Sequence, residues 1–232
     1  MTIYDHQRNT SIGSTIREVV FGLEDGMVST LGAITGIAIG SQDQYTVILS
    51  GAVIIAVESF SMGIGSYISN RSEFEVNQRR IEEEKEEISK FPEQEKEELL
   101  QMFIRDGWPS DLAKTMSETA LKDPNLMLTE MTHRELLITH ASARDAIRNS
   151  VFMFFSYIIG GLFALAAYLF VPIQNAMPIS VIVTLIGLFG IGAFTTKYSK
   201  ASWIKAGGRV LFLGLIALVV GYLIGGLISF IK

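Results

Sequence analysis

The sequence predicts an all-α integral membrane protein with five transmembrane helices and a charged helical domain inserted between the second and the third. Two observations lead to this expectation. Of the 232 residues, 49% are hydrophobic and 19% are charged, and the mean hydropathy is +0.36, as is typical of a membrane protein. The charges are also concentrated in one central segment. Because the chain contains no cysteine, neither disulfides nor thiolate metal sites contribute to the fold.

Five predominantly apolar segments have about the 20 residues that a helix needs to cross a bilayer. They cover residues 21–40, 45–68, 150–171, 179–196 and 210–231. The polar start of the chain lacks the apolar core of a signal peptide, so we expect the first span to be retained as an anchor. The spans divide the chain into residues 1–70 with two spans, the helical domain 71–148, and residues 149–232 with three spans.

Basic residues predict the orientation of the spans. The connections at 41–44 and 172–178 contain no Lys or Arg, whereas residues 195–209 contain four. By the positive-inside rule this basic loop is cytoplasmic. The N-terminus and the 71–148 domain are then also cytoplasmic, and Lys232 lies on the far side of the membrane.

Glycines recur at a spacing of four in the first span, at Gly32, Gly36 and Gly40. Small residues at this spacing allow helices to approach closely in lipid. Glycine is also simply frequent in membrane helices. Three in a row favour a tight contact, and we expect this helix to pack against a second copy of itself in a homodimer.

Residues 71–148 are strongly acidic, with 14 Glu and 4 Asp against 5 Lys and 7 Arg, while the rest of the chain is close to neutral. The expected helices cover 71–90, begin at Pro92 and stop at Gly107, begin near Ser110, and follow the break at Asp123 and Pro124. We therefore expect a small all-helical domain. Its acidity argues against binding to nucleic acid.

A hairpin between the first two of these helices would bring carboxylates together. The residues that face each other are Glu87 with Glu95 and Glu84 with Glu98. Four converging carboxylates repel one another unless a cation lies between them, and oxygen-rich clusters suit divalent cations. The alternative is a solvated acidic surface with neighbouring lysines as partners. The excess of acids over those lysines favours the cation site.

A further candidate group lies later in the same domain. Met127 and Glu130 share a helical face and would combine a soft sulfur with a hard oxygen, which suits ferrous iron better than calcium or magnesium. The alternative is a packed methionine beside a surface charge. His133 and His140, seven apart on one expected helix, have no third partner and are interpreted as structural.

Acidic residues also occur within the predicted spans. Glu24 and Asp25 lie in the first, and Glu58 lies in the second, one turn before Met62. A charge deep in a bilayer costs about 2.5–3.5 kcal/mol on insertion scales, so such residues face a bundle interior, a watery cavity or an ion path. None of the five spans contains a Lys or Arg. A bound cation, a proton or water must therefore compensate these carboxylates.

The stretches FGLEDGMVSTLGAITGIA (21–38) and SFSMGIGSYISNRSEFEV (59–76) resemble the vacuolar iron transporter family, and the likeness covers nearly the whole chain. It implies a homodimer of five-helix subunits with a path for ferrous iron along the subunit interface. A cytoplasmic helical domain would gather the metal, and export from the cytosol would be coupled to inward proton movement. The membrane would be the plasma membrane in a prokaryote and a vacuolar-type membrane in a eukaryote.

The resemblance also assigns site residues. Asp25 and Met62 correspond to the family's intramembrane metal site. We add Glu58 as a candidate proton carrier, and Glu24 as a residue that attracts ions at the cytoplasmic mouth of the path. The corresponding cytoplasmic ligands are Glu84, Glu87, Glu95, Glu98, Met127 and Glu130.

Two positions depart from the family pattern. After Gly65, where family members often have a glutamate, this chain has Ser66, and it carries Glu58 instead. The family's paired methionines are here Leu126 and Met127. The first departure bears on proton coupling and the second on metal preference.

We therefore expect a transporter that exports a divalent transition metal, ferrous iron, in exchange for protons, without an organic cofactor. Manganese, cobalt and zinc are alternative ions, and a membrane-anchored iron store or sensor is the alternative function. An enzyme is not expected. The sequence shows no nucleophile paired with a base, no glycine-rich phosphate loop after a strand, and no pair of Glu-x-x-His motifs of the kind that builds a di-iron site.

Overall fold

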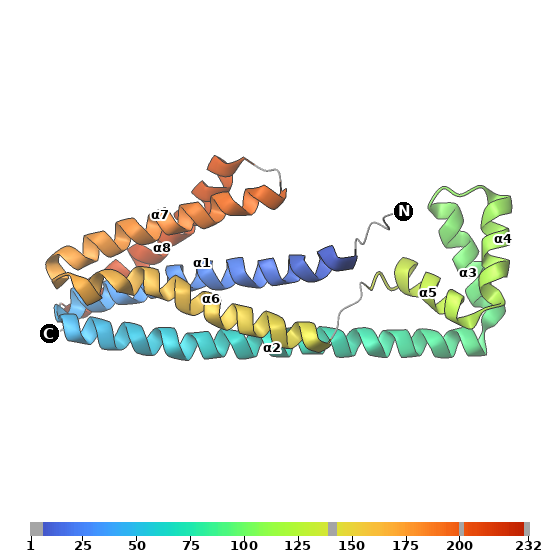
Figure 1. Ribbon diagram of the computed structural model, residues 1–232, viewed down its shortest axis with the longest axis horizontal. Coiled ribbons are helices and arrows are strands. Elements are labelled where there is room, and N and C mark those ends of the chain that lie inside the picture. Colours follow the sequence, from blue (N-terminus) through green and yellow to red (C-terminus); the bar gives the residue numbers. More distant parts are fainter. Residues whose placement is uncertain (1–6, 139–142, 200–201, 230–232) are drawn as a thin grey trace. The chain divides into compact units, whose positions relative to one another are not determined.

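The computed structural model describes residues 7–138, 143–199 and 202–229, and this part of the chain is helical throughout, without strands. Its helices are α1 (Gln7–Ser41), α2 (Gln44–Lys90), α3 (Pro92–Arg105), α4 (Ser110–Leu121), α5 (Pro124–Arg134), α6 (Ala143–Phe170), α7 (Ile173–Ser199) and α8 (Trp203–Ser229) (Figure 1). The predicted all-α class is confirmed. The chain divides into two compact units, an apolar unit (Met1–Ile68 with Arg144–Lys232) and an acidic unit (Ser69–Ala143), and α2 contributes to both.

Four of the described helices are long and apolar enough to cross a membrane, namely α2, α6, α7 and α8. Helix α1 is not among them, because Glu24, Asp25 and several glycines lower the hydropathy of its apolar stretch, residues 21–40. Four of the predicted spans thus coincide with such helices. The first predicted span, residues 21–40 in α1, stays a prediction, and so does the orientation of the spans.

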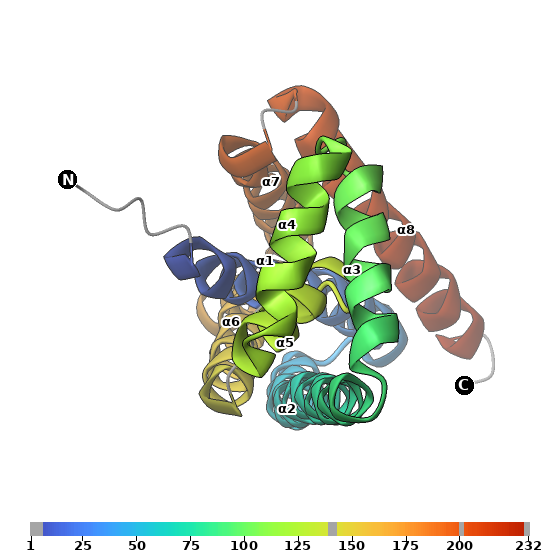
Figure 2. The ribbon, with the colours of Figure 1, turned by 90° about the vertical axis from the view of Figure 1, so that its right-hand side faces the viewer.

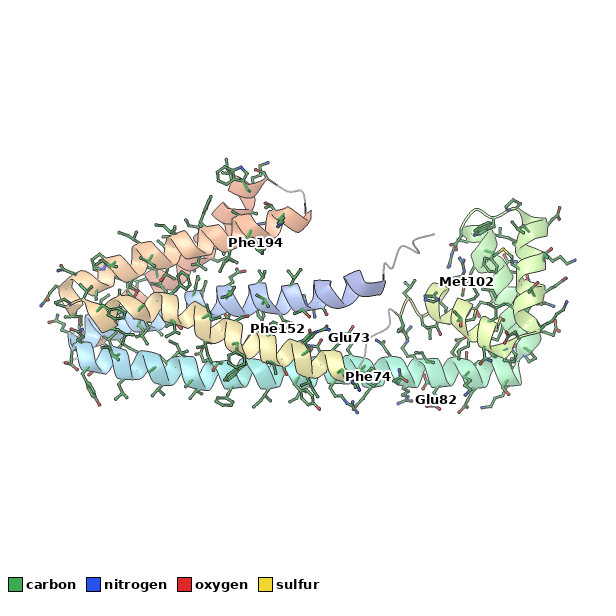
Figure 3. The ribbon with its side chains drawn as sticks, in the orientation of Figure 1. Glu73, Phe74, Glu82, Met102, Phe152 and Phe194 are labelled. Atoms are coloured by element: carbon green, nitrogen blue, oxygen red, sulfur yellow. The ribbon has the colours of Figure 1, made fainter. Side chains whose placement is uncertain are left out.

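The helices of the apolar unit carry many exposed hydrophobic side chains. Phe152 on α6 is 44% exposed and Phe194 on α7 is 55% exposed (Figure 3). Large contiguous apolar surfaces are rare on soluble proteins. The outer faces of these helices are therefore suited to contact with lipid.

Glycines allow α1 to pack directly against α8. A Cβ atom placed on Gly32 would lie 2.9 Å from the carbonyl oxygen of Ala217, and one on Gly36 would lie 2.8 Å from that of Gly221. Neither position has room for a side chain. The tight contact that the glycine spacing predicts is therefore present, but its partner is α8 of the same chain. A second copy is not needed to explain these glycines.

In the acidic unit, α3 and α4 lie side by side and α5 packs against both (Figure 2). Pro92 is the first residue of α3, where its missing N–H costs no hydrogen bond. Gly107, with a φ of +94°, follows the end of α3 in a conformation that favours glycine. The Asp123 carboxylate accepts a hydrogen bond from the Asn125 amide at 3.0 Å and caps α5. The helix starts predicted at Pro92, near Ser110 and after Asp123 are confirmed.

The hydrophobic core of the acidic unit combines residues from α2, α3, α4 and α5. Its buried members are Ile88, Leu99, Met102, Phe103, Ala113, Ala120, Met127 and Met131. This core holds the four helices together and determines which of their side chains face one another.

The α1–α8 contact generates a prediction with a matched control. A Cβ atom on Gly225 would overlap the backbone of Gly36, whereas one on the adjacent Gly226 meets nothing within 4 Å. We expect Gly225→Ala to lower the free energy of unfolding by about 1–3 kcal/mol through overpacking. Gly226→Ala should leave it unchanged or raise it by up to about 1 kcal/mol, because alanine favours helix. Thermal unfolding in detergent compares the two, and equal stabilities would contradict the described packing.

Candidate metal sites

Three carboxylates of the acidic unit converge. They belong to Glu84 of α2, Glu95 of α3 and Glu135, the residue that follows α5, and one oxygen atom of each lies within 4.8 Å of the others. Glu84 is 3% exposed and Glu95 is 7% exposed. Oxygen atoms bound to one divalent cation at about 2.0–2.6 Å can be at most about 5 Å apart. The cluster therefore has the dimensions of a divalent cation site.

Helical periodicity explains why these acids lie beside the hydrophobic core. Each is one turn away from a buried apolar residue on its own chain segment. The pairs are Glu84 with Ile88, Glu95 with Leu99, and Glu135 with Met131. Each carboxylate thus ends a stripe of core residues, so folding of the core draws the three carboxylates together.

Burial and mutual repulsion shape the electrostatics of the cluster. Burial raises the pKa of Glu84 to about 8, and Glu135, Glu95 and Glu87 add to this rise. Burial and the neighbouring Glu98 also raise the pKa of both Glu95 and Glu135. Within the described residues, Glu84 Oε1 is buried without a hydrogen-bond partner. A buried oxygen of this kind requires a proton or a cation for compensation.

All four glutamates of the predicted hairpin take part in this cluster. Glu84 and Glu95 are buried at its centre, while Glu87 and Glu98 are exposed and act on it electrostatically. The pairing differs from the expected one, because Glu84 meets Glu95 more closely than the hairpin numbering implies. Glu135 was not predicted, although its spacing of four from the buried Met131 was a usable signal.

Met127 and Glu130, which we expected to complete the site, have other surroundings. Met127 is 1% exposed in the hydrophobic core. Glu130 Oε2 accepts a hydrogen bond from Arg134 Nε at 2.9 Å. The structure brings Glu135 to the carboxylates instead of Glu130, because five residues correspond to about 140° around a helix. His133 Nδ1 lies 2.9 Å from the Thr129 carbonyl oxygen, and His140 lies outside the described residues.

In the apolar unit, Asp25 of α1 and Glu58 of α2 are electrostatic neighbours. Both side chains are partly buried, as is Met62 one turn after Glu58. Among the ion pairs of the described residues, none includes Asp25 or Glu58. Two acids predicted from separate spans therefore interact electrostatically, and no ion pair of the described residues compensates either of them.

Tyr157 of α6 connects these acids to the helix bundle. Its side chain is fully buried, and its hydroxyl donates a hydrogen bond to Glu58 Oε2 and is also hydrogen-bonded to Ser29 Oγ of α1. Asp25 acts electrostatically on the same hydroxyl. The tyrosine thus joins α1, α2 and α6 at the carboxylates. No sequence pattern distinguished it from the other tyrosines of the apolar segments.

Two more acids of α1 lie near this group. Glu18 is 6% exposed and accepts a hydrogen bond from Ser66 Oγ at 2.9 Å. It precedes Asp25 by seven residues, or about two helical turns, and so shares its helix face. Glu24 lines a hollow of about 360 Å³ together with Arg17 and residues of α7. Glu18 was not predicted, and its spacing from Asp25 was the available signal.

The tyrosine hydrogen bonds generate a prediction. Tyr157→Phe removes the hydroxyl and leaves Glu58 and Ser29 short of a partner, which should lower the free energy of unfolding by about 1–3 kcal/mol. Tyr168 on the same helix is the control, since it is equally buried but its hydroxyl has no hydrogen-bond partner among the described residues. Tyr168→Phe should be neutral or stabilising. Thermal unfolding in detergent ranks the variants, and a neutral Tyr157→Phe would contradict the described network.

The raised pKa of Glu84 predicts how pH affects metal binding. Below about pH 8 this carboxyl holds a proton that a cation must displace, so affinity should fall with falling pH and level off above about pH 8. One displaced proton corresponds to about tenfold in affinity per pH unit. Calorimetric titration of the full-length chain with Co²⁺, in an Asp25→Asn background, at about pH 6 and about pH 8 measures the effect. Glu84→Gln should bind more weakly and with a smaller pH dependence, and an unchanged slope would argue against this role of Glu84.

Comparison with known proteins identifies the family of this chain. A family model described as the VIT family matches residues 16–226. Vacuolar iron transporter 1 of Oryza sativa subsp. japonica is 29% identical over 83% of this chain and 77% of its own length. Vacuolar iron transporter 1 of Arabidopsis thaliana is 25% identical over 93% and 88%, and the vacuolar iron transporter of Plasmodium falciparum is 23% identical over 90% and 81%. The chain is therefore a member of the VIT family.

Proposed function

We propose that this protein exports a divalent transition metal, ferrous iron, from the cytosol in exchange for protons. The main support is that both units contain partly or fully buried carboxylates that form no ion pair with a basic side chain among the described residues. In the apolar unit these are Asp25 and Glu58, and in the acidic unit they are Glu84 and Glu95. The names of the relatives, vacuolar iron transporters, support iron as the cargo and transport as the activity.

In this proposal the two sites act in turn. The acidic cluster gathers the cation through Glu84, Glu95 and Glu135, with Glu87 and Glu98 adding negative charge at its rim. The three converging residues offer oxygen ligands, which suit a hard or borderline ion.

The intramembrane site then transfers the cation across the bilayer. Asp25 is the charged ligand and Met62 adds a soft sulfur contact. Glu58 carries the proton, held in place by the hydroxyl of Tyr157. Glu24, at the hollow beside α7, attracts cations toward Asp25. A carboxylate pair that lacks a basic partner releases its proton when a divalent cation binds, which couples the two flows.

The proposed topology and assembly rest on the sequence. Lys197, Lys205 and Arg209 flank the connection between α7 and α8, and the positive-inside rule assigns that connection to the cytosol. The acidic unit then faces the cytosol as well, because the two spans α6 and α7 lie between it and that connection. The subunits form a homodimer, as the family resemblance implies.

Manganese is the alternative cargo, and the acidic cluster is compatible with it. All three converging ligands are carboxylates, which suit manganese as well as ferrous iron. A membrane-anchored store or sensor would use the same cluster without transport. The relatives are named transporters, which supports transport over an enzymatic activity.

Transport into liposomes tests the proposal. The purified chain is reconstituted into liposomes that contain a metal-sensitive dye and a pH dye, and Fe²⁺ is added outside under reducing conditions. We expect metal to enter while the interior becomes more alkaline. Asp25→Asn should abolish both signals, because a neutral amide no longer compensates the cation.

Asp43→Asn serves as the matched control, since Asp43 is exposed in the turn before α2 and only caps that helix through Thr46. It should transport like the wild type. Metal that binds without reaching the internal dye would identify a store, and entry without a pH change would exclude proton exchange. Competition between Fe²⁺ and Mn²⁺ in the same assay decides the preferred ion.

A further inference from the structure

Arg134, the last residue of α5, makes three contacts, one within α5 and two that tie α5 to α3. Its Nε donates to Glu130 Oε2 at 2.9 Å, and its Nη1 pairs with Asp106, the residue that caps the end of α3. The centre of its guanidinium lies 4.4 Å from the ring centroid of Phe103, over a side chain that is 1% exposed. A planar guanidinium can satisfy two carboxylates and stack on an aromatic ring at once, which a lysine cannot.

The residue after Arg134 is Glu135, the third member of the carboxylate cluster. The helix ends at Arg134, and the backbone departs from helical geometry in the residues that follow. Glu135 N still donates to the Met131 carbonyl oxygen at 2.8 Å, and Leu137 adopts a φ of +51°. Leu136 is 9% exposed and so is anchored on the other side of Glu135. The place of Glu135 therefore depends on how firmly the end of α5 is held.

The guanidinium of Arg134 pairs with carboxylates outside the cluster. Asp106 and Glu130 both pair with it, so two carboxylates compensate one guanidinium. The guanidinium that acts on Glu135 electrostatically is that of Arg80. Arg134 can thus position Glu135 without competing with a cation for the cluster oxygens.

We propose that Arg134, clamped between Glu130, Asp106 and Phe103, is a positioning residue that holds Glu135 against Glu84 and Glu95 and so sets the affinity of the acidic cluster for divalent cations. This inference rests on the proposed metal binding by the cluster. It also gives Glu130 a different role from that of a ligand, because its carboxylate holds the arginine.

A double-mutant cycle between Arg134 and Glu135 tests the clamp. The full-length protein in detergent, in an Asp25→Asn background, is titrated with Co²⁺ at about pH 8, where the cluster releases its protons most readily. Arg134→Lys keeps the charge but loses the fork and the stacking, and it should weaken binding about tenfold, as is typical when a group that orients a metal ligand is lost. Glu135→Gln should weaken binding at least as much. In the Glu135→Gln background, Arg134→Lys should have no further effect on affinity.

Arg79→Lys is the matched control. Arg79 forms the same kind of i,i+4 pair, with Glu83 at 2.7 Å, but its side chain is 80% exposed and the pair lies on α2 alone. It should bind Co²⁺ like the parent. Glu130→Gln and Asp106→Asn, which loosen the clamp while leaving Arg134 in place, should each weaken binding, and circular dichroism verifies that the variants remain helical.

The outcomes separate the clamp from the proposed function. If the parent binds no Co²⁺, or if Glu135→Gln binds as the parent does, metal gathering by this cluster fails and the clamp fails with it. If Glu135→Gln weakens binding but Arg134→Lys does not, only the clamp is overturned. An equal loss from Arg134→Lys in both backgrounds would also overturn it, since the arginine would then act through the general stability of the unit.

Discussion

Both units hold carboxylates beside apolar side chains with few basic partners among the described residues, and this shapes the packing around them. In the acidic unit Glu84 and Glu95 are almost completely buried at the edge of the core. In the apolar unit Asp25 faces Glu58 between two helices. Such groups oppose folding, so packing elsewhere must offset their cost and a proton or a cation must compensate their charge. A site of this kind is therefore suited to exchange a proton for a metal cation.

The packing that offsets this cost takes a different form in each unit. In the apolar unit, glycines let α1 approach α8 until backbone meets backbone, and Tyr157 ties three helices together at the acids. In the acidic unit, short helices share one hydrophobic core, and Arg134 joins the ends of α3 and α5. Both arrangements hold carboxylates at short range against their mutual repulsion. The geometry of each site is thus a property of the surrounding packing.

The two candidate sites also differ in chemistry, in a way that suits successive steps of transport. The acidic cluster consists of oxygen ligands in a unit with many further acids, which raises the local concentration of cations. The proposed intramembrane site adds the sulfur of Met62 to the oxygen of Asp25, and a mixed ligand set selects more strongly for borderline ions. The acidic cluster would then collect cations before the intramembrane site selects among them.

The helical class, the helix boundaries at Pro92, Gly107 and Asp123, and the acids in apolar segments could all be predicted from the amino-acid sequence. These features follow from local chemistry and from composition, which need no knowledge of neighbours. Three features could not be predicted: Glu135 rather than Glu130 joins the cluster, the glycines of α1 pack against α8, and Tyr157 is hydrogen-bonded to Glu58. Periodicity shows which side chains share a helix face, but long-range packing decides which faces meet.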